Sequence, residues 1–336
     1  MINRPTSPAF IALGLALLIG CASETGALNS EVDADAASAA LTLEAPQHGV
    51  QLQTNGVLIE PGDDLRWCEV LELPGTAEDL YRIDRIEAEA TEFANDIVVS
   101  VALLGSPTEA AMDPGTRVPC SRAGEVFGEE VELLFASQQR YLEERLPTGV
   151  GRELRGGQRI AVESHYFNPT EEPTVAAARI NLHTTAAPLA HLARLASFEN
   201  FTIYTPPGGS SSHMAECRVS EPMVVTQLIR RTQQHGTGFT VWRAGGEGDG
   251  ELLWHSAAPE DTHHDPSEPI LLETGAGFRF QCDYHNTSGF ELRAGVTASD
   301  ETCALQALWY SADSREPLDT EGCLVLRVDE DGVGRD

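Results

Sequence analysis

The sequence predicts an all-β protein made of two tandem antiparallel β-sandwiches. From Gln51 onward, short runs rich in Val, Leu, Ile and aromatic residues are separated by Gly, Pro, Asp and Asn. Runs of this length with these separators are typical of antiparallel strands joined by turns. The 336 residues, of which 41% are hydrophobic, can build one large or two medium domains. A proline-containing segment at 186–197 separates two stretches that share this pattern of short apolar runs and turn residues, although their sequences do not repeat. We therefore expect one sandwich at 49–186 and a second at 187–328.

The first residues are expected to form an export signal, 1–20, that ends before a lipidated cysteine. Residues 9–20 are an apolar run too short to span a bilayer. The run ends in Leu-Ile-Gly-Cys, which resembles the bacterial lipobox, whose cysteine, here Cys21, is lipidated and becomes the mature N-terminus. An ordinary signal peptide that contains a cysteine is the alternative. Ala22 resembles the residue that directs lipoproteins to the outer membrane, so we expect an exported protein anchored there.

Small and acidic residues follow the signal and also end the chain. Residues 21–48 predict a flexible tether and 329–336 an acidic tail. Acidic residues outnumber basic ones by 52 to 22, which gives a formal charge of −30. This charge argues against nucleic acid or an anionic membrane surface as a direct partner, because both require a basic footprint. We therefore expect the lipid to be the only membrane attachment, and the partner to be an unidentified small molecule or protein.

Six cysteines remain after Cys21 is set aside. An even number in an exported chain predicts up to three disulfides. The six are Cys68, Cys120, Cys217, Cys282, Cys303 and Cys323.

Three local segments have their own predictions. Residues 131–145 fit a helix on periodicity, and we leave helix and strand open there. Gly245 to Gly250, a glycine-rich run, predicts a hairpin loop between two tryptophan-bearing strands. His263 and His264 lie among acidic residues and prolines, which favours a surface loop.

No local motif for hydrolysis or phosphate binding is present. The chain contains no HExxH, CxxC, GxSxG or Walker sequence. A catalytic zinc needs three convergent protein ligands, and no tight spacing of the ten histidines supplies them. The function must therefore be sought in longer-range similarity.

Several short motifs, taken in order, resemble the copper type II, ascorbate-dependent monooxygenases. That family includes peptidylglycine α-hydroxylating monooxygenase and dopamine β-monooxygenase. The resemblance covers about 51–325, nearly the whole mature chain. The matching stretches are LPTGVG at 146–151, GGQRIAVESHYFNP at 156–169, YTPPGG at 204–209 followed by Cys217, QQHGTG at 233–238, FQCDYHNTS at 280–288 and SDETCALQALWY at 299–310.

The resemblance implies two jelly-roll-like sandwiches, each with one copper site. It also implies that Cys282 pairs with Cys303 and that Cys217 pairs with Cys323. Cys68 and Cys120 are then left, and we pair them by elimination.

The first copper site of the family is incomplete in this chain. His165, at the end of SHYFNP, matches the family's His-Tyr ligand. The family's His-His pair falls at Val99 and Ser100, neither of which binds copper through its side chain. We therefore expect His165 to be structural, with its imidazole hydrogen-bonded across the domain interface or facing the cleft between the sandwiches.

The second copper site also retains one ligand of three. The family's His-x-His pair falls at Gln233 and His235, and its methionine falls at Thr302. Copper that cycles between two oxidation states needs several imidazole or thioether donors at one point. His213 and Met214 are the side chains that a rebuilt site would use.

Three functions are therefore weighed. The first is a degenerate family member, lipid-anchored, without a cofactor, that acts as a binding or structural module. The second is an active monooxygenase with two coppers, which hydroxylates a C–H bond with dioxygen and a reductant such as ascorbate. The third is a lipoprotein that handles one copper through His235, His213 and Met214.

Overall fold

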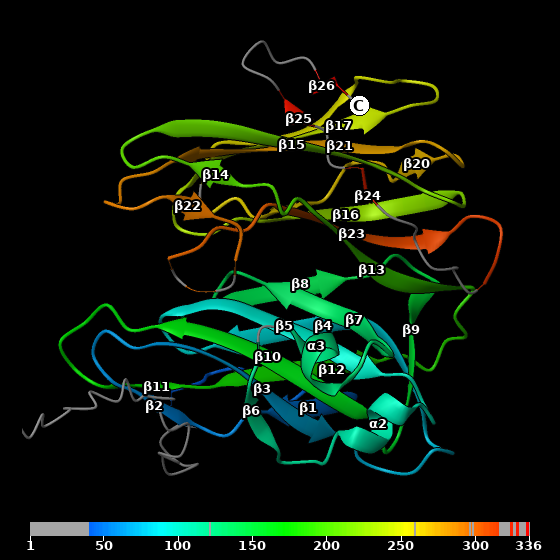
Figure 1. Cartoon of the computed structure of the whole chain (residues 1–336). Helices are drawn as coiled ribbons and strands as arrows, with labels where there is room; N and C mark the ends of the chain where they lie inside the picture. The colour runs from blue at the N-terminus through cyan, green and yellow to red at the C-terminus, as the bar shows by residue number, and fades with distance from the viewer. Residues whose placement is uncertain are drawn as a thin grey trace, which may run out of the picture.

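The computed structural model confirms the all-β fold class. It describes residues 40–315 except 121, 259, 296 and 298, and the backbone of 323–324, 327–328 and 334–335. Two sandwiches are stacked on each other, with the N-terminal one below in Figure 1. The helices in this part of the chain are short, α2 (Pro107–Ala111) and α3 (Ala123–Phe127). No helix among the described residues is long and apolar enough to cross a membrane.

The first sandwich consists of two facing sheets. One has the order β1 (Gly49–Gln53), β12 (Ala178–Thr184), β4 (Leu80–Ala90) and β9 (Val150–Arg155), with β8 (Tyr141–Arg145) also beside β4. The other has the order β6 (Arg117–Pro119), β3 (Asp64–Glu72), β10 (Arg159–Phe167), β5 (Ala94–Ala102) and β7 (Val131–Ser137). A small ribbon pairs β2 (Val57–Ile59) with β11 (Thr174–Ala176).

The second sandwich repeats this two-sheet plan. Its first sheet contains β13 (His191–Glu199), β23 (Ala304–Ser311) and β16 (Met223–Arg231), with β19 (His263–His264) and β20 (Ile270–Leu272) beside β16. Its second sheet has the order β18 (Leu252–Ser256), β17 (Gly236–Ala244), β21 (Gly277–His285), β15 (Ser210–Arg218) and β24 (Cys323–Leu324). Short ribbons pair β14 (Tyr204–Thr205) with β22 (Leu292–Arg293) and β25 (Arg327–Val328) with β26 (Gly334–Arg335).

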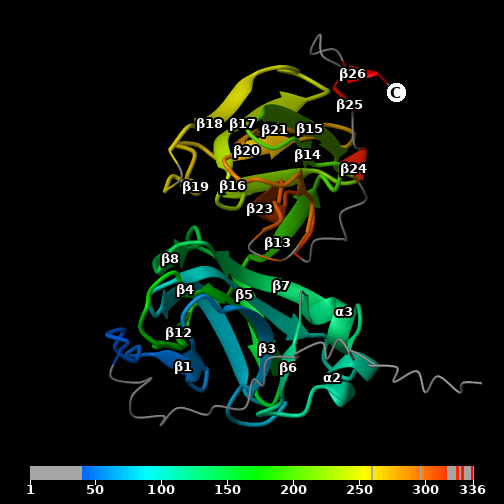
Figure 2. The ribbon, with the colours of Figure 1, turned by 60° about the vertical axis from the view of Figure 1, so that its left-hand side comes forward.

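The two sandwiches share one continuous ten-stranded sheet. β9 of the first pairs in parallel with β13 of the second, with His191 opposite Val150 and Leu192 opposite Gly151. A β-carbon at Gly151 would lie 2.6 Å from the carbonyl oxygen of Ile83 in β4, so the close approach of β9 to β4 at this point requires glycine. Figure 2 shows β13 at the junction of the two sandwiches. A separate apolar cluster, which includes Val98, Ala136, Leu195, Ile229 and Leu308, fills the space between their facing sheets.

Strand alternation decides which side chains reach this space. On β10, Ile160, Val162 and Tyr166 face the core of the first sandwich, where Tyr166 stacks on Trp67 with ring centroids 5.5 Å apart. The intervening residues point to the opposite face of the sheet, where Ala161 packs against a cluster that includes Met112, and His165 points into the space between the sandwiches. The same alternation on β5 places Val99 in the core.

Two sequence predictions need correction, and one open alternative is decided. The 131–145 segment, for which helix and strand are both open on sequence, forms β7 and β8, because its residues pair with β5 and β4. His263 and His264 form strand β19 rather than a surface loop, and burial lowers the pKa of His263 to about 4. The end of the predicted tether is bound to the first sandwich, since the backbone N–H groups of Thr42 and Leu43 each donate to Glu89 at 2.6 Å.

Other local predictions are confirmed. Residues 245–250 join β17 and β18, which pair as a hairpin and carry Trp242 and Trp254. Cys68 is bonded to Cys120, and Cys282 to Cys303. Cys217 is also disulfide-bonded, and Cys323 stands opposite it in β24. The predicted signal peptide, the predicted lipidation site at Cys21 and most of the predicted acidic tail lie outside the described residues.

Candidate functional site

A cavity of about 300 Å³ lies between the two sandwiches. The first sandwich contributes Arg66, Asp96 and His165, and the second contributes Arg231 and Gln233 among others. Three of the positions that the resemblance aligns with copper ligands, His165, Gln233 and Thr302, thus line one space. We call this space the first cavity.

His165 is held by two neighbours from its own sandwich. Its Nε2 lies 2.7 Å from Asp64 Oδ1, and its Nδ1 lies 3.1 Å from an amino group of Arg66. Only 2% of the residue is exposed. Register explains the second contact, because His165 stands directly opposite Arg66 in the β10–β3 pair. The imidazole therefore faces the cleft, which is the second of the two alternatives that the sequence left open for His165. Each of its ring nitrogens has a polar partner.

His165→Ala is expected to lower the free energy of unfolding by about 1–3 kcal/mol, because it removes the buried imidazole that contacts both Asp64 and Arg66. Urea denaturation measures the loss, and His48→Ala, at an exposed histidine, is the matched control. Equal stability of the two variants would contradict the structural role of His165.

Asp96 joins the two sandwiches electrostatically. Its carboxylate pairs with Arg231 of the second sandwich and lies 3.7 Å from Arg66 of the first. Only 4% of the Asp96 side chain is exposed. Burial lowers the pKa of Arg66, while Asp96 counteracts part of that shift. One carboxylate thus holds two guanidinium groups at the boundary of the cleft.

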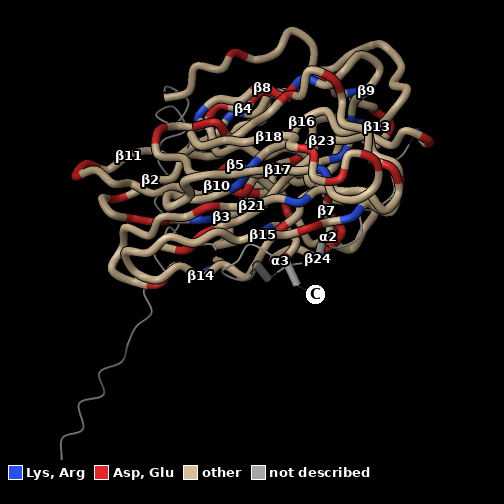
Figure 3. Tube along the Cα trace, turned by 90° about the horizontal axis from the view of Figure 1, so that it is seen from above, with Lys and Arg blue, Asp and Glu red and all other residues tan. Residues whose placement is uncertain are grey.

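The first cavity is positively charged in a strongly acidic protein. Three arginines line it (Arg66, Arg230 and Arg231), against one carboxylate, Asp96. Arg230 is buried and donates to Ser256 Oγ at 3.1 Å, and burial lowers its pKa. Figure 3 shows acidic positions distributed over the chain in red, with fewer basic positions in blue. The arginines therefore concentrate positive charge where the sandwiches meet.

Gln233 and Thr302 bind each other where the resemblance implies copper ligands. Gln233 Nε2 donates to Thr302 Oγ1 at 3.2 Å. The carboxylate of Glu301 accepts the backbone N–H groups of Gln233 at 2.9 Å and His235 at 2.7 Å. Burial raises the pKa of Glu301 to about 7, although these hydrogen bonds act in the opposite direction. Glu301 therefore fixes the loop that presents Gln233 to the cavity.

His235 is not among the residues that line the first cavity. Its ring Nδ1 lies 3.5 Å from Thr287 Oγ1, and its backbone oxygen accepts the N–H of His285 at 3.0 Å. The backbone hydrogen bond between His235 and His285, next to the β17–β21 pairing, thus holds His235 beside the end of β21.

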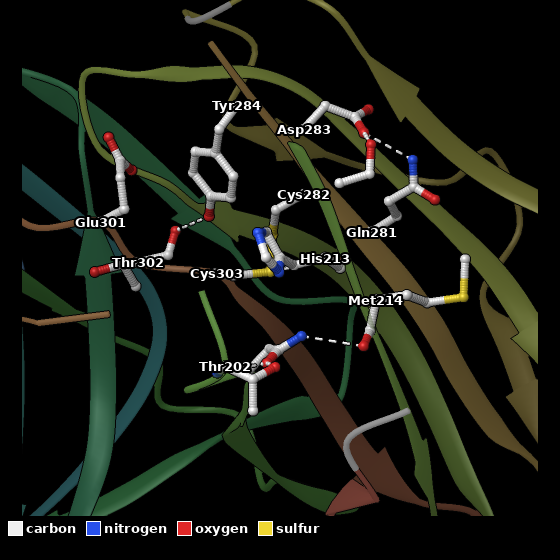
Figure 4. The surroundings of a disulfide bond; sticks show 12 residues. Thr202, His213, Met214, Gln281, Cys282, Asp283, Tyr284, Glu301, Thr302 and Cys303 are labelled. Atoms are coloured by element: carbon white, nitrogen blue, oxygen red, sulfur yellow. Dashed lines mark hydrogen bonds between the residues drawn. A yellow bond between two sulfur atoms is a disulfide. The ribbon is translucent and has the colours of Figure 1, made fainter. Parts of the chain in front are cut away.

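His213 and Met214 do not form a site together. They are neighbours on β15, and Figure 4 shows the Met214 side chain pointing away from the His213 ring. His213 Nε2 lies 3.1 Å from the Tyr204 carbonyl oxygen and 2.9 Å from Ser211 Oγ. Burial lowers the pKa of His213. Figure 4 places His213 next to the Cys282–Cys303 disulfide.

The two positions of the implied His-His pair have separate surroundings. Val99 is fully buried in the core of the first sandwich. Ser100 instead faces the second sandwich and lines a second cavity of about 350 Å³.

The donor set does not fit copper at either position. Copper would have to displace Asp64 or Arg66 from His165, and the Arg66 guanidinium would repel it at the ring. At the other position, Gln233 and Thr302 offer oxygen and amide groups, which are poor donors for Cu(I). Among the described residues, no three His, Cys, Asp or Glu side chains are arranged to hold a metal ion.

The charged residues of the cleft were not found from the sequence. Arg66, Asp96, Arg230 and Arg231 are ordinary charged residues in their local sequence. Arg231 lies two residues before Gln233, the first residue of a matched motif. This short distance is the one feature of the sequence that could have directed attention to a charged residue of the cleft.

Comparisons with known proteins give distant likenesses in structure alone. No family profile and no curated protein matches the chain. Peptide N-glycosidase F, a glycosylasparaginase from Flavobacterium meningosepticum, has 9% identity and a TM-score of 0.35, over 84% of this chain and 100% of that one. A triple jelly-roll protein of an archaeal virus has 8% identity and a TM-score of 0.23, over 82% of this chain and 62% of that one. Bacillus subtilis oxalate decarboxylase, as its S161A mutant, has 7% identity and a TM-score of 0.18, over 83% and 72%.

Proposed function

We propose that the protein is an exported, lipid-anchored binding module whose first cavity holds a small anionic molecule. In this proposal it is a degenerate relative of the copper type II, ascorbate-dependent monooxygenases at the bacterial outer membrane. The arginines of the first cavity are the observation that carries the binding function. The disulfides support export, because such bonds persist in oxidising compartments.

The charge of the cavity selects the ligand class. Three arginines and one carboxylate line it, so an anion gains Coulomb attraction there that the acidic outer surface does not offer. Guanidinium groups match carboxylate and phosphate oxygens with paired N–H donors. Arg231 retains donor capacity for this purpose, since its buried Nε has no hydrogen-bond partner. A carboxylate or phosphate group is therefore the recognised feature.

Amide groups complete the recognition surface. Gln138 donates from Nε2 to the Thr232 carbonyl oxygen at 2.8 Å, and Gln233 is fixed through its own backbone by Glu301. Both side chains line the first cavity. Held in this way, they offer polar contacts without further loss of side-chain entropy when a ligand binds.

The two copper functions require metal that the donor set disfavours. Metal analysis of protein purified after growth with copper distinguishes the three functions. Two coppers per chain support the monooxygenase, one supports copper handling, and none supports the binding module.

Arg231→Gln is expected to weaken binding of phosphate or succinate by about 10- to 100-fold, since a hydrogen bond to a charged group contributes about 1.5–3 kcal/mol. Isothermal titration calorimetry of the full exported chain with each anion measures the change. Arg293→Gln, which removes a well-exposed surface guanidinium, is the control and should bind as the native protein does.

The salt dependence of binding and the choice of anion complete the test. Preference for phosphate identifies a phosphate ligand, and preference for succinate a carboxylate ligand. Arg231→Lys keeps the charge without the paired donors, so it should lie between the native protein and Arg231→Gln. Equal affinity of native protein and Arg231→Gln, with both folded, would refute the proposal.

A further inference from the structure

The second cavity lies beside the first and shares some of its walls. Arg66, Arg231 and Thr302 line both cavities. The remaining walls of the second cavity differ, because β5 and β7 contribute Val98 and Leu133. A space of about 350 Å³ lies within the size range of small-molecule sites.

Gln306 reaches this cavity from the second sandwich. On β23, Leu305 and Ala307 face the core of that sandwich, so the side chain between them faces the first sandwich. Gln306 is 0% exposed, and neither its Oε1 nor its Nε2 has a hydrogen-bond partner. A buried amide without partners is unfavourable, so a molecule that occupies the cavity and pairs with both atoms gains free energy there. Gln306 offers one acceptor and one donor side by side.

The charged groups around the second cavity are balanced. Arg122 pairs with Glu199. The arginines that line this cavity are matched by four glutamates, Glu125, Glu129, Glu163 and Glu199. Burial raises the pKa of Glu163, whose Oε1 accepts the backbone N–H of Ala123 at 2.9 Å. The second cavity therefore lacks the excess positive charge of the first.

The geometry points to a small neutral molecule with a carboxamide or lactam edge as the ligand of the second cavity. Its adjacent N–H and C=O pair with Oε1 and Nε2 of Gln306. Its apolar part lies against Val98, Val131 and Leu133, which line the same space. Ser100 adds a hydroxyl at the cavity wall.

Two ring compounds of equal size test the pairing in the native chain. 2-Pyrrolidinone carries the adjacent N–H and C=O, whereas cyclopentanone carries the C=O alone. Titration followed by ¹H–¹⁵N NMR, with the Gln306 side-chain amide as reporter, gives both dissociation constants. We expect cyclopentanone to bind at least about fivefold more weakly, because it leaves Oε1 of Gln306 unpaired. Equal affinity would overturn the proposal.

Gln306→Leu is the variant for the same measurement, since it keeps much of the side-chain volume and removes both polar atoms. It should lose the preference for 2-pyrrolidinone and should bind phosphate or succinate in the first cavity as the native chain does. A crystal soaked in 2-pyrrolidinone should show the ring against Gln306. If the soaked crystal shows ordered water alone beside Gln306 at high 2-pyrrolidinone concentration, the proposal is refuted. This outcome does not depend on whether the Gln306→Leu variant folds.

Discussion

Asp96→Ala is expected to lower the free energy of unfolding by about 3–5 kcal/mol, the usual cost of removing one partner from a buried ion pair. The Asp96 carboxylate is the group that Arg231 and Arg66 share. Without it, two guanidinium groups face each other at the contact between the sandwiches, and their mutual repulsion already contributes to the lowered pKa of Arg66. Chemical denaturation followed by tryptophan fluorescence measures the change.

Two further variants separate charge from volume. Asp96→Asn keeps the size of the side chain and removes its charge, so it should lose most of the same stability. Asp313→Ala, at an exposed aspartate, should change stability by less than about 0.5 kcal/mol. A loss below about 1 kcal/mol for Asp96→Ala would show that Asp96 does not hold the arginines together.

Replacing both Cys282 and Cys303 by alanine is expected to cost about 3 kcal/mol, because the disulfide closes a loop across 21 positions and restricts the unfolded chain. The bond ties β21 to the residue that precedes β23, so it joins the two sheets of the second sandwich. Thermal unfolding in oxidising buffer measures the difference from the native protein.

Reductant provides the control for this bond. With the disulfides reduced, the native chain loses the same constraint, so the difference between the two proteins should largely disappear. An unchanged melting temperature in oxidising buffer would mean that the bond does not restrict the unfolded chain as proposed.

Strand-level features were predictable because they depend on local sequence. Alternating apolar residues and glycine-rich turns predicted the all-β fold and the 245–250 hairpin. The segment 131–145 was ambiguous, because Ser137 and the residues after it carry no strong turn signal. Its outcome was decided by pairing with β5 and β4, which lie far away in the sequence.

The cleft could not be predicted, because register decides it. Arg66 and His165 are 99 positions apart, and Asp96 and Arg231 are 135 positions apart. Whether such side chains meet depends on which residues stand opposite each other in the sheets. The motifs located His165 and Gln233, and the fold then added the arginines.

The two sandwiches also share a corner structure that is not visible in the sequence. Asn168 follows β10, and its side chain accepts the N–H of Thr170 and donates to the Ile59 carbonyl oxygen. Asn286 follows β21 with the same pattern, accepting from Ser288 and donating to Thr205. Only a Tyr-x-Asn triplet is common to the two corners, which is too short to appear as a repeat.

The backbone pairing of β9 with β13 also determines how molecules enter and leave the cleft. A hinge that swings the two sandwiches apart would have to break hydrogen bonds inside a shared sheet, beside a glycine that admits no side chain. We therefore expect molecules to reach the cleft while the backbone pairing of the two sandwiches stays in place. Entry would then depend on side-chain motions, which are faster than rotations of whole domains.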